Sequence, residues 1–172
     1  MDTPDAGFSA PDITPGWWVP GQWNEGVPYQ WGGFCTLRQF DRGVARGLAA
    51  GDVYTLEKRR LLDTGVSREA VGIDCSGFVS RCWGLPRPYS TRELAAICTP
   101  LSDYDELLPG DILNTHNPHC LLFAAWVDAG RSRIWAYEAG VAPEWKVVRH
   151  RPTVASLKDC GFVPLRYRGM AD

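Results

Sequence analysis

The first half of the chain carries hydrophobic residues at helical spacing. From Leu37 to Leu62 the apolar positions follow a helical period, with an interruption at Gly51-Asp52. A second apolar stripe runs from Asp74 to Trp83 and ends at Gly84-Leu85-Pro86, which stops a helix. The segment Arg92 to Cys98 follows a serine and a threonine that can cap a helix N-terminus. The pattern therefore predicts two short helices, one buried helix and one capped helix.

The second half of the chain changes its period. Short apolar or alternating runs, separated by Gly, Pro, Asp and Asn, are typical of antiparallel strands. These runs are Asp111 to Leu113, Cys120 to Val127, Arg133 to Glu138, Trp145 to His150 and Phe162 to Arg168. Helices first and strands afterwards predict an α+β fold with helices packed on an antiparallel sheet, not alternating βαβ units.

Composition narrows the class of protein further. The 172 residues, 45% of them hydrophobic, fit one domain with one core. Lys and Arg number 18 against 20 Asp and Glu, so no basic surplus exists for phosphates and we expect no nucleic-acid partner. No run reaches the roughly 18 apolar residues of a membrane span. The acidic start at Met1 to Asp5 is unlike a signal peptide, so a cell-envelope or secreted location requires a signal that has been removed.

The segment from residue 1 to residue 27 is non-periodic and rich in Pro, Gly and Trp. It holds Trp17, Trp18 and Trp23, and three tryptophans so close together are unfavourable in water. We expect this segment to pack against the domain. The alternative is a segment that binds a partner.

Cys75 is the strongest candidate for chemistry. It follows Asp74 and precedes Ser76-Gly77, at the first turn of the predicted buried helix. Unpaired amides and the positive end of the helix dipole stabilise a thiolate at such a position. The other cysteines lack this setting, and we interpret them as small buried thiols. They are Cys35, Cys82, Cys98, Cys120 and Cys160.

A thiolate nucleophile needs an imidazole to share its proton, and the chain has three histidines. His119 ranks first because it opens a predicted strand, followed by His150 at a strand end and His116 in a loop. His116 and His119 with Cys120 also have the spacing of metal ligands. No further Cys/His pair completes a tetrahedral set, so we expect no metal and no cofactor.

Glu138 is the best acceptor to orient His119, because it lies on the next predicted strand. In an antiparallel hairpin the numbers of two directly opposed residues always add to the same value. If that value is odd, His119 and Glu138 lie on the same face of the sheet. An even sum separates them. The apolar neighbours of Glu138 favour an enclosed carboxylate.

At these residues the sequence resembles the NlpC/P60 family of papain-like cysteine peptidases. Four stretches carry the resemblance in the family's order: Gly26 to Gly33 (the first motif), Asp74 to Val79 (the nucleophile motif), Leu108 to Leu113, and His119 to Phe123. The resemblance implies a papain-like α+β fold in one catalytic domain spanning residues 1–172. Within it we expect an extended arm at residues 1–25 and a helical insertion at residues 34–72 that flanks the cleft.

The resemblance also implies a Cys-His-Glu triad. Cys75 then attacks a carbonyl and helps hold the oxyanion with its backbone N–H, His119 transfers the proton, and Glu138 orients His119. The family usually has His, Asn or Gln at the third position, so Glu144 and His150 are alternatives to Glu138.

The implied activity is hydrolysis of peptide or amide bonds in peptidoglycan stem peptides, typically between D-γ-glutamate and a diamino acid. Residues that match Tyr29, Asp74 and Ser76 line the substrate's end in cell-wall relatives, so these three are predicted binding positions. One alternative is an acyltransferase with the same residues. Another is a catalytically silent module that binds cell-wall or protein ligands.

Overall fold

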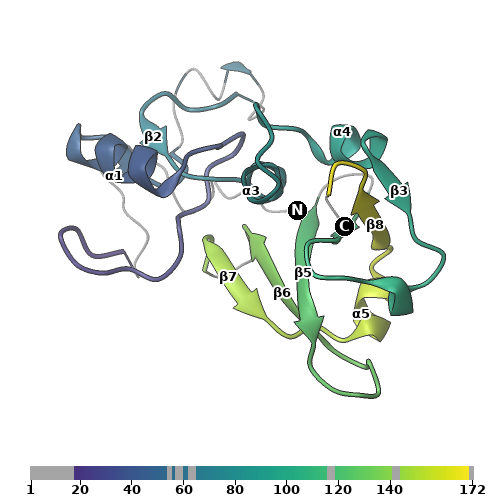
Figure 1. Ribbon diagram of the computed structural model, residues 1–172. Coiled ribbons are helices and arrows are strands. Elements are labelled where there is room, and N and C mark those ends of the chain that lie inside the picture. The colour runs from purple at the N-terminus through teal and green to yellow at the C-terminus, as the bar shows by residue number, and fades with distance from the viewer. Residues whose placement is uncertain are drawn as a thin grey trace.

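The fold is described from a computed structural model, which covers residues 18–53, 56, 60–61, 65–115, 119–140 and 144–170. It is mixed α+β, as predicted. A six-stranded antiparallel sheet has the order β3-β8-β4-β5-β6-β7, and a separate parallel pair joins β1 to β2 (Figure 1). The described helices are α1 (Leu37–Ala45), α3 (Cys75–Cys82), α4 (Thr91–Ala96), α5 (Val154–Asp159) and the 3-10 turn η2 (Tyr104–Glu106). The strands are β1 (Ala49–Ala50), β2 (Ala70–Val71), β3 (Cys98–Pro100), β4 (Ile112–Asn114), β5 (Cys120–Trp126), β6 (Ile134–Ala139), β7 (Val147–His150) and β8 (Val163–Tyr167).

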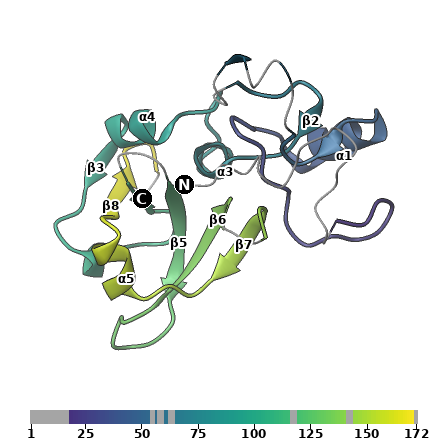
Figure 2. The same cartoon turned by 180° about the vertical axis from the view of Figure 1, so that it is seen from behind.

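Helix α3 lies between the sheet and the smaller group formed by α1, β1 and β2 (Figures 1 and 2). One hydrophobic cluster joins α3 and α4 to the sheet, through Val79 and Leu94 against Ile112 and Leu165. A second cluster fills the side of the sheet near η2 and α5, with Leu121, Phe123, Ile134, Ala136 and Leu157. Burying a large aliphatic or aromatic side chain contributes about 1.5–3 kcal/mol, so the first cluster holds α3 firmly against the sheet.

Several expectations about elements need correction. The helix predicted from Arg92 to Cys98 ends at Ala96, because Cys98 begins β3 and pairs with Tyr167. Helix α5 and turn η2 were not predicted. The insertion at residues 34–72 is helical only in part, since it contains α1 but also β1 and β2. The second helix expected before Leu62 lies largely outside the described residues.

The N-terminal arm follows its prediction only in part. Trp18 packs edge-on against Phe40 of α1, with ring centroids 5.1 Å apart. Trp23 is fully exposed. Trp17 lies outside the described residues. Packing of the arm against the domain is therefore shown for Trp18 alone.

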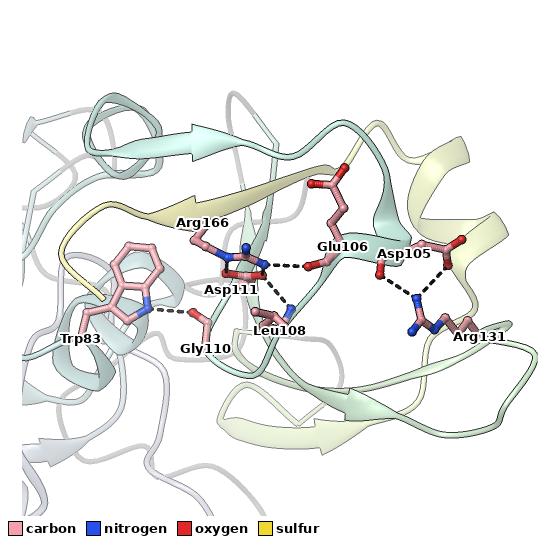
Figure 3. Close-up of polar contacts among 8 residues, drawn as sticks. All are labelled: Trp83, Asp105, Glu106, Leu108, Gly110, Asp111, Arg131 and Arg166. Carbon is pink, nitrogen blue, oxygen red and sulfur yellow. Dashed lines mark hydrogen bonds and ion pairs between the residues drawn. The ribbon is translucent and has the colours of Figure 1, made fainter. Parts of the chain in front are cut away.

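The turn before β4 is built around a buried carboxylate, as Figure 3 shows. Asp111 is fully buried and accepts two hydrogen bonds from Arg166, at 3.0 Å from Nε and 2.7 Å from Nη2. It also accepts the backbone N–H of Leu108 at 2.8 Å. The indole of Trp83, at the end of α3, donates to the carbonyl of Gly110 at 2.9 Å. These hydrogen bonds fix the positions of β8, the turn before β4 and the end of α3 relative to one another.

The β5–β6 hairpin contains a bulge that decides which side chains share a face. The register shifts between Phe123 and Ala125, so that Phe123 pairs with Ala136 and Ala125 pairs with Trp135. Between the bulge and the turn, the numbers of paired residues add to an even value. If this pairing continued along the whole hairpin, His119 and Glu138 would lie on opposite faces. Beyond the bulge the sum is odd. The extra residue of the bulge therefore puts Glu138 on the same face of the sheet as His119, where the two side chains meet.

Candidate active site

Cys75 is the first residue of α3, as the sequence predicts, and its side chain lies between the helix and β5. Asp74 is the N-cap and accepts the backbone N–H of Gly77. Cys75 is buried, with 8% of the residue exposed. A helix N-terminus stabilises negative charge, so the fold places this thiol where a thiolate is favoured.

Asp74 ties the two predicted motifs together. The oxygen that accepts from Gly77 also accepts from the hydroxyl of Ser76 at 3.3 Å, and the other oxygen accepts the backbone N–H of Gly32 at 3.0 Å. A Cβ at Gly77 would come within 2.1 Å of the carbonyl oxygen of Gly33, so only glycine lets the first motif lie against the helix start. Burial raises the pKa of Asp74 to about 7, helped by the charge of Cys75 and opposed by these hydrogen bonds.

The sulfur of Cys75 has two hydrogen-bonding partners from the start of β5. The thiol of Cys120 donates to it, and so does the imidazole of His119. The bond from Cys120 is the main cause that lowers the pKa of Cys75 well below its ordinary value, and it outweighs burial. The hydrogen bond and positive charge of His119 lower that pKa further. The surroundings of Cys75 therefore favour the thiolate form.

His119 bridges Cys75 and Glu138. Its Nε2 contacts a carboxylate oxygen of Glu138, which leaves Nδ1 as the nitrogen available to the sulfur. Burial alone would lower the pKa of His119, but the hydrogen bonds to Cys75 and Glu138 raise it to about 10. The proton therefore resides on His119, and the two side chains form a thiolate–imidazolium pair.

Glu138 is almost fully buried, at 2% exposure, and contacts two histidines. One carboxylate oxygen contacts His119, and the other forms an ion pair with Nε2 of His150 on β7. Burial raises the pKa of Glu138, but the two imidazoles outweigh it and hold that pKa at about 2. The result is a continuous row of side chains, Cys75–His119–Glu138–His150.

Thr115 fixes the backbone at His119. Its hydroxyl donates to the carbonyl of His119 at 2.9 Å and accepts the N–H of the same residue at 3.0 Å, while its own N–H donates to that carbonyl at 2.9 Å. The connection between β4 and β5 is thus closed at its base. His116, the lowest-ranked histidine, lies outside the described residues.

The three predicted binding residues lie around the nucleophile with mainly buried side chains. Tyr29 is 6% exposed, pairs with Ile73 through a parallel bridge, and packs its ring near Trp145. Ser76 is 7% exposed and donates to Asp74. Their roles toward a substrate remain predictions, whereas the contacts of Asp74 and Ser76 show a role in building the start of α3.

Sequence reasoning missed the contact of Cys120 with Cys75. Cys120 was interpreted as an ordinary buried thiol, and it is indeed fully buried. It also hydrogen-bonds the nucleophile, because it faces α3 at the first position of β5. His150 was named only as an alternative third member, and the structure places it behind Glu138. Strand alternation would place Cys120 on the face opposite His119, so the sequence pattern carries no signal for its contact with Cys75.

A large cavity lies elsewhere. It has a volume of about 1150 Å³ and lies between residues 18–27, α1 and the side of α3 that carries Phe78 and Arg81. A smaller groove of about 360 Å³ runs along β7 and is lined by Glu144 and His150. Neither is lined by Cys75. His119, which contacts Cys75, has a side chain that is 23% exposed.

Two further findings concern the described residues only. No group of three or more His, Cys, Asp or Glu side chains among them could hold a metal ion. Within the same part of the chain, no helix has both the length and the apolar character needed to cross a membrane.

Comparisons with known proteins identify no relative. No model of a known protein family matches the chain, and no curated protein or solved structure is significantly similar to it. The site must therefore be interpreted from its own geometry.

The thiolate at Cys75 predicts selective alkylation. Iodoacetamide should modify Cys75 well before the other five thiols, with the exposed Cys160 as the internal control. Its rate at pH 6 should stay within about threefold of that at pH 8, whereas a thiol with an ordinary pKa loses roughly 100-fold. Peptide mapping by mass spectrometry measures both quantities. Equal labelling of all six thiols would contradict an activated nucleophile.

The charge of Glu138 predicts a moderate effect of the neutral isostere. In Glu138→Gln the amide oxygen still accepts from His119, but the loss of charge should lower kcat/KM about tenfold, because a charge-assisted bond becomes a neutral one. The pKa of His119 should fall, so the alkaline limb of the pH profile should move to lower pH. The exposed Glu69→Gln is the control. An unchanged limb with normal turnover would show that the charge contributes nothing.

Proposed function

We propose that the protein is a cysteine hydrolase of the papain-like NlpC/P60 type that cleaves peptide or amide bonds. The observation that supports this most is the row Cys75–His119–Glu138, with the nucleophile at a helix N-terminus and the imidazole directly before strand β5. A buried carboxylate, an imidazole and a thiolate in mutual contact are the arrangement that nucleophilic catalysis requires.

The proposed reaction begins from the thiolate–imidazolium pair. The sulfur of Cys75 attacks the substrate carbonyl carbon, and the amides at the start of α3 stabilise the oxyanion that forms. His119 gives its proton to the leaving amine nitrogen, so the C–N bond breaks and a thioester remains on Cys75. A water molecule then loses a proton to His119 and attacks the thioester. The acid product leaves, and Cys75 again carries the thiolate.

Glu138 acts through His119 in this scheme. Its contact with Nε2 directs Nδ1 toward the sulfur and stabilises the imidazolium while the proton is held there. His150 contacts the second oxygen of the same carboxylate and so restricts its rotation. The positive charge that faces the thiolate is thus kept in place through both chemical steps.

For the substrate we propose peptidoglycan stem peptides, with cleavage between D-γ-glutamate and the diamino acid. The support is the resemblance of the first motif, the nucleophile motif and the histidine strand to the NlpC/P60 family. The 34–72 insertion flanks this region and bears on which stem peptides fit.

Defined muropeptides test the proposal. The protein is incubated with a stem tetrapeptide, and the products are weighed by mass spectrometry, with Cys75→Ala as the matched control. Two fragments whose masses sum to the substrate plus one water, absent in the control, are the expected result. Fragments that appear only when an amine acceptor is added would indicate acyl transfer instead. Binding of the stem peptide without turnover would indicate a silent module and contradict the proposal.

A further inference from the structure

We propose that Cys75 and Cys120 are an oxidation site: hydrogen peroxide converts these two thiols to a reversible disulfide across the α3–β5 interface. This chemistry does not depend on hydrolysis of any substrate. It follows from the position of a second thiol directly against the nucleophile.

The two sulfur atoms are brought together by the packing of the core. Cys75 begins α3, Cys120 begins β5, and both belong to the hydrophobic cluster that holds the helix on the sheet. Their thiols are hydrogen-bonding partners, and neither is part of a disulfide in the structure. A disulfide bond joins sulfurs about 2 Å apart, and it can form between these two because they are hydrogen-bonded neighbours in one packed cluster.

The surroundings of the two thiols assign them different roles. The surroundings of Cys75 at the start of α3 favour the thiolate, which is the form that reacts with peroxide, and 8% of the residue is exposed. Cys120 is completely buried, and its hydrogen bond to Cys75, together with burial, raises its pKa well above the ordinary value. Burial also raises the pKa of Cys35 to about 11 and that of Cys98 to about 12. Among these four thiols, peroxide therefore attacks Cys75 first.

The reaction proceeds in two balanced steps. The Cys75 thiolate attacks one peroxide oxygen, the O–O bond breaks and a sulfenic acid forms, while the departing hydroxide takes the proton held on His119 and becomes water. The charge that held the proton on Cys120 is then gone, because a sulfenic acid is neutral. The sulfur of Cys120 attacks the sulfenic sulfur, the S–O bond breaks, and the departing oxygen takes up the Cys120 proton as water. In sum, two thiols lose two electrons and peroxide is reduced to two waters.

The disulfide has a consequence for the site. It occupies the sulfur of Cys75, so the nucleophile is lost while the bond lasts. Because Cys120 intercepts the sulfenic acid, the irreversible sulfinic and sulfonic acids form more slowly. A thiol reductant then restores the thiolate.

The test uses the full chain and the mass of the intact protein. After treatment with a small excess of hydrogen peroxide, the wild type should lose two hydrogens, and its maleimide-reactive thiols in denaturant should fall from six to four. A peptide map should contain a Cys75–Cys120 cross-link that dithiothreitol removes. In Cys120→Ser the cross-link should be absent, and Cys75 should instead gain one oxygen that dimedone traps.

The control is Cys98→Ser, which changes another buried thiol of the same hydrophobic cluster and should still form the Cys75–Cys120 bond. If a variant fails to fold, the wild-type map alone decides the outcome. Direct conversion of wild-type Cys75 to sulfinic acid, or a bond to any other cysteine, would overturn the proposal. Neither result would bear on hydrolysis, which is measured separately with muropeptides.

Discussion

Replacing Cys75 with alanine should lower kcat/KM for a stem peptide by about 1000-fold or more, since mutating the nucleophile removes the covalent route altogether. The methyl group cannot attack the carbonyl, and His119 has no thiolate to pair with. Stability should change by less than about 1 kcal/mol, because His119 can lose its proton and Asp74 still caps α3. Steady-state kinetics and urea unfolding measure the two quantities.

The matched control is Cys82→Ala, at the opposite end of the same helix. Cys82 is exposed, and this variant should retain wild-type kcat/KM. If Cys75→Ala kept more than a tenth of the activity, Cys75 would not be the nucleophile. A large loss of stability in the same variant would make the kinetic result uninformative, and the alkylation experiment would then decide the role of Cys75.

The second large effect is expected for stability. Arg166→Met should lower the free energy of unfolding by about 3 kcal/mol, because it leaves a buried charge without its partner. The side chain of Asp111 has no exposure, whereas that of Arg166 is 33% exposed, so water can compensate only on the arginine side. The substitution also removes the bond from Arg166 to the carbonyl of Glu106 at 2.6 Å. Methionine keeps the aliphatic stem, so packing is nearly conserved.

Figure 3 also shows the control for this prediction, a surface ion pair in the same region. Arg131 lies 3.6 Å from the carboxylate of Asp105, with both side chains largely exposed. Arg131→Met should cost about 1 kcal/mol or less, as is usual for exposed pairs. Urea denaturation of both variants gives the comparison. Equal losses would show that burial of Asp111 does not set the strength of its ion pair.

Much of the fold could be predicted from local pattern. The stripe between Asp74 and Trp83 gave α3 together with both of its caps, because an acidic N-cap and a Gly-Leu-Pro stop are short-range signals. Strand β3 was missed because its pairing with β8 joins Cys98 to Tyr167, far along the chain. The β1–β2 pair has only two residues per strand, too few for a period to be detected.

In the candidate site, too, the residues could be identified from local pattern, whereas their tertiary contacts could not. Cys75, His119 and Glu138 were each identified from residue type and setting, and the structure brings all three into contact. The bulge between Phe123 and Ala125 could not be predicted, because the extra residue leaves no mark in the apolar pattern. The contact of Cys120 with Cys75 depends on how α3 packs on the sheet, which is tertiary information.

The bulge in the β5–β6 hairpin also separates the tip of that hairpin from the reacting groups. The turn side keeps the pairing of Ala125 with Trp135, while the site side keeps that of Phe123 with Ala136. The two ends of the hairpin thus have different strand registers. A change in loop length between Asp128 and Ser132 need not alter the position of the Glu138 carboxylate. The tip is consequently a favourable place for an inserted affinity tag or fluorescent label.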